Sequence, residues 1–496
     1  MSDADPHLIP VIAGIGEIID RESSLEPRTL IAGAVRGALA GAPSLAEAID
    51  SLDVISIASF KYLDIAAIVA GDTGLSPRRA AESSVGGEKP IRLLGEAAER
   101  IATGEIRSAI ICGGEAMRAR AQAVKRGEAL AWGPADPAAR PSTPLDYVTQ
   151  QAANHGLTQP TNVYPLYENA TRHSWGQSLD EGQAESSALW HRYSEAAARN
   201  EFAWLGREFD AAEIGNDTAD NRMIAFPYRK LMVANPMVNQ AAAVLVTSLA
   251  RARAAGLADA DLIFIGSGAR ADEPKDFLTR DRFDRSSAQD EVLTSTLAAN
   301  DMAAAGIDLW ELYSCFPTVP KMARRTLALA SDFDPSVTGG LTFFGAPANN
   351  YMTHAITAAV RALRNGESQT ALLYGQGEFV TKHAAILLSR IASGRMPEMK
   401  DVQAAAEARM GPLPTLLATY EGPATIESYT VIFDRDGAPV QAPIVLRTPE
   451  GNRTVALGDL SDPGLADWLT GPNASPIGAK GSVSALDDAT LRFQRA

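Results

Sequence analysis

The chain has 496 residues, a formal net charge of −15 and a sequence pI near 5.0. This length exceeds one ordinary hydrophobic core, so we expect two or three domains. The acidic balance argues against nucleic acid as a partner, because binding phosphates needs a net basic face. A small anionic ligand needs only a local basic patch and stays possible.

The expected location follows from cysteine usage and from the absence of targeting features. Two cysteines, Cys112 and Cys315, cannot form a disulfide framework and fit a reducing compartment. The N-terminal MSDADPHLIP has neither the cationic nor the apolar region of a signal peptide. No segment reaches the roughly 18–20 apolar residues of a membrane span. We therefore expect a cytoplasmic protein with no membrane span.

The first predicted α/β unit has a counterpart later in the chain, at a fixed offset of 262 residues. Segment 91–114, IRLLGEAAERIATGEIRSAIICGG, aligns with segment 353–376, THAITAAVRALRNGESQTALLYGQ. Each pattern predicts a helix that ends at Gly-Glu, then a continuous apolar strand and a glycine-rich turn. Earlier strands match too, LIPVIAGIGE at 8–17 and LIFIGSGARA at 262–271. Any two α/β units share some of these features, but the common spacing indicates two duplicated halves.

Two further regions flank this repeat. A long insertion at roughly 116–235 is rich in Trp, His, Arg and Pro, and such insertions on a rigid scaffold are usually functional. After about residue 395 short alternating strands with Asp-Gly and Glu-Gly turns predict a small all-β module. We expect an N-terminal half at 1–250, a C-terminal half at 251–395, a linker at 396–412 and a barrel-like domain at 413–496.

The ordered motifs resemble those of the thiolase superfamily. ATGEIRSAIICGGEAM is similar to a thiolase strand ending in a Gly-Gly-x-Glu-x-Met turn, and NPMVNQAAAVLVTS to the family's Asn-x-x-x-Asp-Gly-Ala-Ala-Ala segment. GGLTFFGAPANN stands where thiolases have Gly-Gly…Gly-His-Pro, and YSCF where sterol-carrier-type thiolases have His-Asp-Cys-Phe. The likeness spans about residues 8–395, and the C-terminal module resembles the OB-fold-like domain of thiolase-like protein type 1. The resemblance implies a duplicated α/β/α/β/α fold with a small C-terminal β-barrel.

Three thiolase positions have changed. The place of the nucleophilic cysteine falls at about Gly87, the Gly-His-Pro histidine is Ala346, and the cysteine of the Cys-x-Gly turn is Gly375. Because glycine offers no nucleophile, the usual acyl-cysteine intermediate is not expected.

Three groups that can carry protons remain. Cys315 matches the acid/base cysteine of sterol-carrier-type thiolases, His354 begins the helix after the altered loop, and His383 follows the second glycine turn. A thiol beside an imidazole can serve as base or nucleophile. Each group also has a structural interpretation, since a free cysteine is often a small buried hydrophobe and histidines often cap helices. Cys112, in the middle of a strand, is predicted to be core.

Other candidates complete the predicted site. Helix starts, glycine turns and amides suit thioester and oxyanion oxygens, although the asparagines fit a turn equally well. In thiolases this insertion binds CoA, so its cationic side chains are candidates for contacts with the CoA phosphates. Most cationic residues of a protein, however, are only solvated surface. The histidines of the insertion lack metal-ligand spacing, so we expect no metal and no bound cofactor, with coenzyme A at most a (co)substrate. The substrate or oxyanion candidates are Tyr313, Ser314, Asn349, Asn350, Gly375 and Gly377, and the CoA candidates are Arg118, Arg120, Lys125, Arg229 and Lys230.

Two functions stay open. One is an acetyl-CoA acetyltransferase-type enzyme that makes or breaks a C–C bond in a β-keto acyl compound, with acid/base catalysis by Cys315 and His354 or His383. The other is a non-catalytic relative that binds acyl-CoA or assists a partner protein. Because thiolases pair through a sheet edge, a homodimer is also possible. Convergence of the three proton-carrying groups in one pocket would favour the enzyme.

Overall fold

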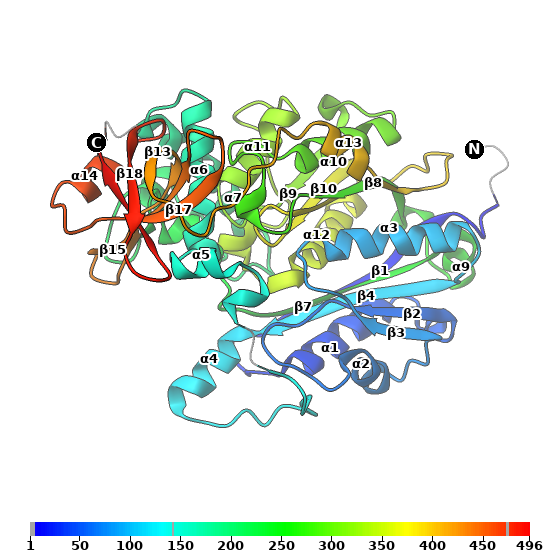
Figure 1. Ribbon diagram of the computed structural model, residues 1–496. Helices are drawn as coiled ribbons and strands as arrows, with labels where there is room; N and C mark the ends of the chain where they lie inside the picture. The colour runs from blue at the N-terminus through cyan, green and yellow to red at the C-terminus, as the bar shows by residue number, and fades with distance from the viewer. Residues whose placement is uncertain (1–4, 141–142, 473–475) are drawn as a thin grey trace.

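In the computed structural model of residues 5–140, 143–472 and 476–496, the strands of the two halves join in one ten-stranded sheet, and the part that each half contributes is called the first and the second sheet below (Figure 1). The strand order is β3-β2-β4-β7-β1 in the first half and β8-β11-β10-β9 in the second, with β12 beside β8. The halves join where β1 pairs with β8 at Val11–Phe264 and Ile12–Ile263. The strands are β1 (Pro10–Ile19), β2 (Ile49–Val54), β3 (Arg79–Glu82), β4 (Ser108–Ala116), β7 (Asn239–Ser248), β8 (Ile263–Asp272), β9 (Leu309–Leu312), β10 (Thr370–Gly377), β11 (Lys382–Ser389) and β12 (Met399–Asp401).

Helices complete the five predicted layers. Two central helices contact strands of both sheets, and the others cover the outer faces (Figure 1). The predicted α/β/α/β/α arrangement is therefore confirmed. The central helices are α3 (Lys89–Ala102) and α12 (Tyr351–Arg364); α1 (Pro27–Leu39) and α2 (Ile65–Thr73) cover the first sheet, and α10 (Ser287–Ala299) and α11 (Thr318–Thr326) the second.

The internal repeat is visible in the element boundaries. Helix α3 and strand β4 begin at Lys89 and Ser108, and α12 and β10 begin 262 residues later at Tyr351 and Thr370. Strand β4 is buried along its whole length, as expected for a continuous apolar strand between two helical layers. The repeat places the two helix starts and the two strand ends close together at the middle of the molecule.

The insertion folds into helices that reach the second half. Its helix α6 directs Tyr164 to the carbonyl of Glu378 (2.7 Å), and α7 directs Tyr193 to the carbonyl of Leu312 (2.7 Å). Ser178 caps α7 in a capping box with Glu181. The elements are α4 (Met117–Arg126), α5 (Gln150–Asn154), α6 (Pro160–Ser174), α7 (Leu179–Arg199), α8 (Ala211–Gly215), β5 (Met223–Ala225) and β6 (Tyr228–Arg229).

The C-terminal module is a closed five-stranded barrel, as predicted. It rests on the insertion and on the segment after β8, since Ser428 donates to the carbonyl of Leu166 (2.6 Å) and Arg453 to that of Leu278 (2.6 Å). The barrel strands are β13 (Gly422–Tyr429), β16 (Pro443–Arg447), β17 (Arg453–Gly458), β18 (Lys480–Ala485) and β19 (Leu491–Arg495); α9 (Leu249–Ala254), α13 (Gln403–Ala408), β14 (Ile432–Phe433), β15 (Pro439–Gln441) and α14 (Leu465–Thr470) complete the chain.

In the described part of the chain, every helix is too short or too polar to cross a membrane.

Candidate active site

Cys315 lies just after β9 against side chains from β10 and α6. Its side chain is nearly buried, with 8% of the residue exposed. The Gln376 amide donates to the sulfur (3.2 Å) and to the Tyr164 hydroxyl (2.7 Å). Burial raises the pKa of Cys315 to about 12, although hydrogen bonds with Tyr164 and Gln376 oppose the rise. At neutral pH the group is therefore a thiol that can give a proton, and it is not an activated nucleophile.

The turn between β10 and β11 beside Cys315 has a strained backbone. Glu378 and Val380 have φ of +55° and +61°, a region that costs non-glycine residues roughly 1–3 kcal/mol each. The turn is held from several sides: the Tyr167 hydroxyl donates to the Phe379 carbonyl (2.6 Å), and the Val380 N–H donates to Gln376 (3.1 Å). Strain that the surroundings impose in this way is common at functional sites.

His383 supports this turn. Its Nδ1 lies 2.7 Å from the Tyr374 hydroxyl and its Nε2 3.2 Å from the Val380 carbonyl, which places the proton on Nε2. Burial, together with the charge of the nearby Arg280, lowers the pKa of His383 to about 3. The ring is thus neutral with both nitrogens engaged, and among the described residues no hydrogen bond joins it to Cys315.

His354 belongs to a different network. It is fully buried on α12, and its Nδ1 pairs with Glu17 of β1 (2.6 Å), which also pairs with Arg361 (2.6 Å). Burial raises the pKa of Glu17, but the interactions with His354 and Arg361 outweigh it and keep the pKa below its usual value. Its ring packs against Phe344 of the altered loop (5.1 Å between ring centroids), and its Nε2 has no hydrogen-bond partner among the described residues. Among the described residues no hydrogen bond joins His354 to Cys315.

The position of the lost nucleophile has no room for a side chain. A Cβ placed on Gly87 would overlap the Gln376 carbonyl and lie 2.6 Å from the Tyr313 hydroxyl oxygen. Tyr313 thus occupies the space where a thiolase-type side chain would extend. At Gly375 a Cβ would lie 2.9 Å from Met352. The surrounding structure matches the loss of both cysteines.

Glu88 is a site residue that the sequence analysis missed. It directly precedes α3 and is fully buried, and neither carboxyl oxygen has a hydrogen-bond partner in the described structure. Its nearest cations are Lys89 Nζ (3.5 Å) and Arg92 Nε (3.6 Å). Burial raises the pKa of Glu88, with Arg92 and Lys89 opposing the rise. A glutamate at a helix start normally faces solvent, so its sequence context indicated nothing unusual.

The predicted substrate or oxyanion residues divide into two groups. Ser314 and the asparagines hold the backbone: Ser314 accepts from the Leu341 N–H (3.3 Å), Asn349 from the Gly86 N–H (3.0 Å), and Asn350 donates to the Gly113 carbonyl (2.8 Å). Gly375 and Gly377 allow β10 to lie against Glu88. Tyr313 differs, because in the described structure its hydroxyl enters no hydrogen bond and 6% of the residue is exposed.

The predicted CoA-binding cations lie on two separate elements. Three come from α4, where Arg118 lies over the Trp204 ring (5.5 Å) and Arg120 and Lys125 are exposed. The other two come from the segment at β6, where Arg229 donates to Gln183 (3.2 Å) and Lys230 is exposed.

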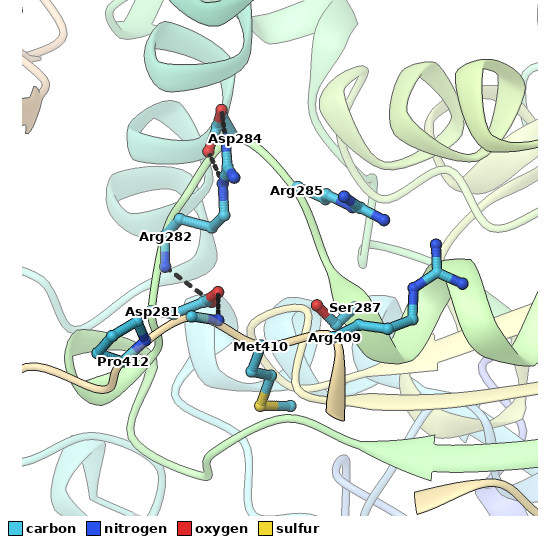
Figure 2. Close-up of a pocket in the computed structure, with 9 residues that line it drawn as sticks. Asp281, Arg282, Asp284, Arg285, Ser287, Arg409, Met410 and Pro412 are labelled. Atoms are coloured by element: carbon cyan, nitrogen blue, oxygen red, sulfur yellow. Dashed lines mark hydrogen bonds and ion pairs between the residues drawn. The ribbon is translucent and has the colours of Figure 1, made fainter. Parts of the chain in front are cut away.

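A cavity of about 440 Å³ opens where α13 and the β8–α10 segment meet (Figure 2). In Figure 2 Arg282 pairs with Asp284, while Arg285 and Arg409 extend toward the same side of the opening. Arg285 pairs with Asp290 (2.5 Å) and Arg409 with Glu291 (3.1 Å), so the cavity is polar but close to charge-balanced. It is lined by Asp281, Arg282, Asp284, Arg285, Ser287, Arg409, Met410, Gly411 and Pro412. A neighbouring cavity of about 360 Å³ includes Ser286, whose hydroxyl lies 3.3 Å from His383 Nε2.

One surface cluster has ligand atoms near enough for a metal ion. His191, Glu195 and Glu208 offer atoms within 4.8 Å of one another, and no ion is needed to explain them because His191 lies 3.9 Å from each carboxylate. Sequence spacing did not indicate the group, because Glu208 lies outside α7. We assign no metal to it.

Known proteins place this geometry in context. The family model of the thiolase-like protein type 1 additional C-terminal domain matches residues 401–488. A monomeric SCP2-thiolase like protein type 1 from Mycobacterium smegmatis is similar over 100% of both chains, with 28% identity and a TM-score of 0.84. An Ltp2–ChsH2(DUF35) aldolase matches 78% of this chain and 99% of its own, with 19% identity and a TM-score of 0.59. Human mitochondrial 3-ketoacyl-CoA thiolase in complex with CoA matches 78% of this chain and 99% of its own, with 13% identity and a TM-score of 0.57. No curated protein matches the chain.

The last two likenesses show the fold alone. The type 1 likeness covers the whole chain, and the family model covers most of the barrel. The chain is thus a thiolase-fold protein that resembles thiolase-like protein type 1 over its full length and carries the additional C-terminal domain of that group.

Proposed function

We propose that the protein is an enzyme that makes or breaks a C–C bond in an acyl-CoA or related β-keto compound by acid–base chemistry, without an acyl-cysteine. The observation that carries this proposal is the replacement of the nucleophile position by other proton-carrying groups. Gly87 has no space for a side chain, the Tyr313 hydroxyl lies beside it, and the Cys315 thiol accepts from Gln376, whose carbonyl also faces Gly87. Acid–base chemistry needs groups that hold protons, and these two groups hold theirs at neutral pH.

Cys315 is the proposed acid. When the bond between Cα and the β-carbonyl breaks, the electron pair stays on Cα as a thioester enolate, and the thiol gives it a proton. Tyr313, which has no hydrogen-bond partner in the described structure, would donate to the oxyanion that forms. Water, or an acyl acceptor in its place, takes the released acyl group.

The histidines receive a different role in this proposal. His383 holds the strained turn and His354 pairs with Glu17, so we assign both rings to keeping the site in shape. Coenzyme A as a substrate, and its contacts with the insertion cations, remain proposals that rest on the thiolase fold.

A non-catalytic, ligand-binding function has one observation in its favour. Cys315 and Tyr313 expose only 8% and 6% of their surfaces, which restricts access of a thioester to the site. A protein of this kind would bind acyl-CoA and leave it unchanged.

The possible homodimer also stays a prediction. Two observations favour a monomer: the edge strand β3 has only four residues, among them Arg79 and Glu82, and the similar Mycobacterium smegmatis protein is described as monomeric.

Turnover of acyl-CoA and β-keto acyl-CoA compounds, with acetoacetyl-CoA as the first probe, tests the proposal. We expect C–C cleavage by the native protein and a rate lower by about 10²–10⁴ in Cys315→Ser, with ligand binding retained. Cys112→Ser is the matched control, since Cys112 is buried in the core of β4 and should leave the rate unchanged. Equal rates in Cys315→Ser and the native protein would remove Cys315 from the chemistry, and binding without turnover would favour the binding-only function.

A further inference from the structure

Glu88 is a carboxyl group buried at a cost to stability. A buried polar atom without a partner costs roughly 1–3 kcal/mol, and native proteins contain few of them. Both oxygens of Glu88 are in this position, and the nearest cations, Lys89 and Arg92, lie at 3.5 and 3.6 Å, beyond hydrogen-bond distance. A group that keeps this arrangement needs a reason other than stability.

The surrounding backbone makes a place for this carboxyl. A Cβ on Gly86 or on Gly377 would overlap Glu88 Oε2, so only glycine leaves the space that the carboxyl fills. Gly377 ends β10 and Gly86 precedes the lost nucleophile position. The carboxyl therefore lies between the two turns that bound the altered thiolase site.

Glu88 also lies near Tyr313. A Cβ on Gly87 would lie 2.6 Å from the Tyr313 hydroxyl oxygen, and a Cβ on Gly377 would lie 3.0 Å from the Gly87 nitrogen and 2.3 Å from Glu88 Oε2, so both groups pack around Gly87. Burial raises the pKa of the Tyr313 hydroxyl, and the charges of Cys315 and Glu88 add to the rise.

The duplicated half provides an internal reference. The offset of 262 residues relates Glu88, before α3, to Asn350, before α12. Asn350 is buried too, but its amide donates to the Gly113 carbonyl (2.8 Å) and its oxygen accepts from Thr353 (2.7 Å). A satisfied side chain at this position is therefore available to the fold, and Glu88 departs from it.

We propose that Glu88 is the general base that works with Cys315 in the proposed C–C cleavage, with water as co-substrate. The Glu88 carboxylate takes a proton from water as its oxygen bonds to the β-carbonyl carbon. The Cα–Cβ bond then breaks, and Cα takes the thiol proton of Cys315. Water then carries the proton back: Glu88 gives its proton to a water molecule, and the Cys315 thiolate takes one from water. The products are a carboxylic acid and a shorter acyl thioester, and both residues regain their starting states.

This inference rests on the proposed function, but proton transfer at Cα can be measured without cleavage. Acetyl-CoA is incubated with the protein in D₂O, and deuterium at Cα is followed by NMR. Exchange needs a Cys315 thiolate, which forms when Glu88 takes the thiol proton. We expect exchange by the native protein and a rate lower by about 10²–10⁴ in Glu88→Gln and in Cys315→Ser.

A pH profile separates a base from a structural residue. The exchange rate of the native protein should rise with pH through the raised pKa of Glu88, and the small residual rate of Glu88→Gln should lack this limb. Glu88→Gln should also melt no lower than the native protein, so lost exchange cannot reflect unfolding. Glu17→Gln serves as the control for a buried carboxyl outside the site: it should melt lower and, where folded, keep the native pH limb.

The outcomes are distinct. Exchange that is equal in Glu88→Gln and the native protein overturns the role of Glu88, whether or not acetoacetyl-CoA is cleaved. Exchange that depends on Glu88 without cleavage of acetoacetyl-CoA supports Glu88 and overturns the proposed cleavage. Absence of exchange in the native protein overturns the Glu88 proposal as well.

Discussion

The two helix starts at the centre of the molecule come from one repeated unit but differ in what their side chains do. In the second half, Asn350 and His354 each bond to the first half, to Gly113 and to Glu17. In the first half, Glu88 faces the second half without a hydrogen bond, beside Gly87 and Gly377. One copy thus bonds across the contact between the halves, with only His354 Nε2 left unpartnered among these groups, while the other leaves both oxygens of the Glu88 carboxyl without a partner. We infer that Glu88, which gains no hydrogen bond from its burial, is kept for a reason other than stability.

The largest expected loss of stability comes from removing the ion pair between His354 and Glu17 at the second-half helix start. His354→Ala leaves the buried Glu17 with Arg361 and the Thr357 hydroxyl, and losing one partner of a buried pair costs about 3–5 kcal/mol. Chemical denaturation measures this loss. If His354 were instead a catalytic residue, the variant would lose turnover with its stability nearly unchanged.

A second change weakens the same copy through its hydrogen bonds. Asn350→Ala leaves the Gly113 carbonyl without its partner and should lower the free energy of unfolding by about 1–3 kcal/mol. Denaturant midpoints of the variant and the native protein give the difference. An unchanged midpoint would mean that the two helix starts are not energetically different.

The matching substitution at the helix start of the first half, Glu88→Gln, should raise the free energy of unfolding instead of lowering it. The pKa of Glu88 is raised above its ordinary 4.5, so above pH 4.5 the unfolded chain ionises this group more readily than the folded protein, and stability falls as pH rises. Glu88→Gln removes the cost of burying an ionised carboxylate. The free energy of unfolding should therefore increase by about 1–2 kcal/mol at pH near 8, with little increase below pH 4.5. Urea denaturation at both pH values tests this. A Glu88→Gln variant that is less stable at both would contradict the claim of an unsatisfied carboxyl.

The smallest effect at neutral pH concerns His383. Its pKa is lowered to about 3 from an ordinary 6.5, so below 6.5 the unfolded chain binds a proton that the folded protein does not. As the pH is lowered below 6.5, the free energy of unfolding should therefore decrease by up to about 1.4 kcal/mol per pH unit. His383→Gln should flatten this part of the stability curve. A native protein whose stability is level from 6.5 downward would show that His383 protonates in the fold.

Much of the fold followed from local patterns in the sequence. The repeat of 91–114 at 353–376 predicted both central helices and the buried strands after them, and the turn spacing after 395 predicted the barrel. These features depend on residues close together in the chain, which periodicity reports well.

The site followed less completely, because its contacts join distant residues. Cys315 was expected at the site, but its partners Gln376 and Tyr164 come from another strand and from the insertion. His354 was expected at the start of the helix after the altered loop, and its ring does pack against Phe344 of that loop, but its pairing with Glu17 on β1 was not predicted. Glu88 could not be singled out, since its burial results from Gly86 and Gly377 meeting around it.

Intact-protein mass spectrometry during turnover of acetoacetyl-CoA tests the central claim most directly. The claim is that Gly87 and the Tyr313 hydroxyl have replaced covalent catalysis by acid–base chemistry. We predict cleavage of the substrate with the mass of the protein unchanged when the reaction is quenched at steady state. An acetyl adduct that forms on Cys315 and disappears as substrate is consumed would contradict the account.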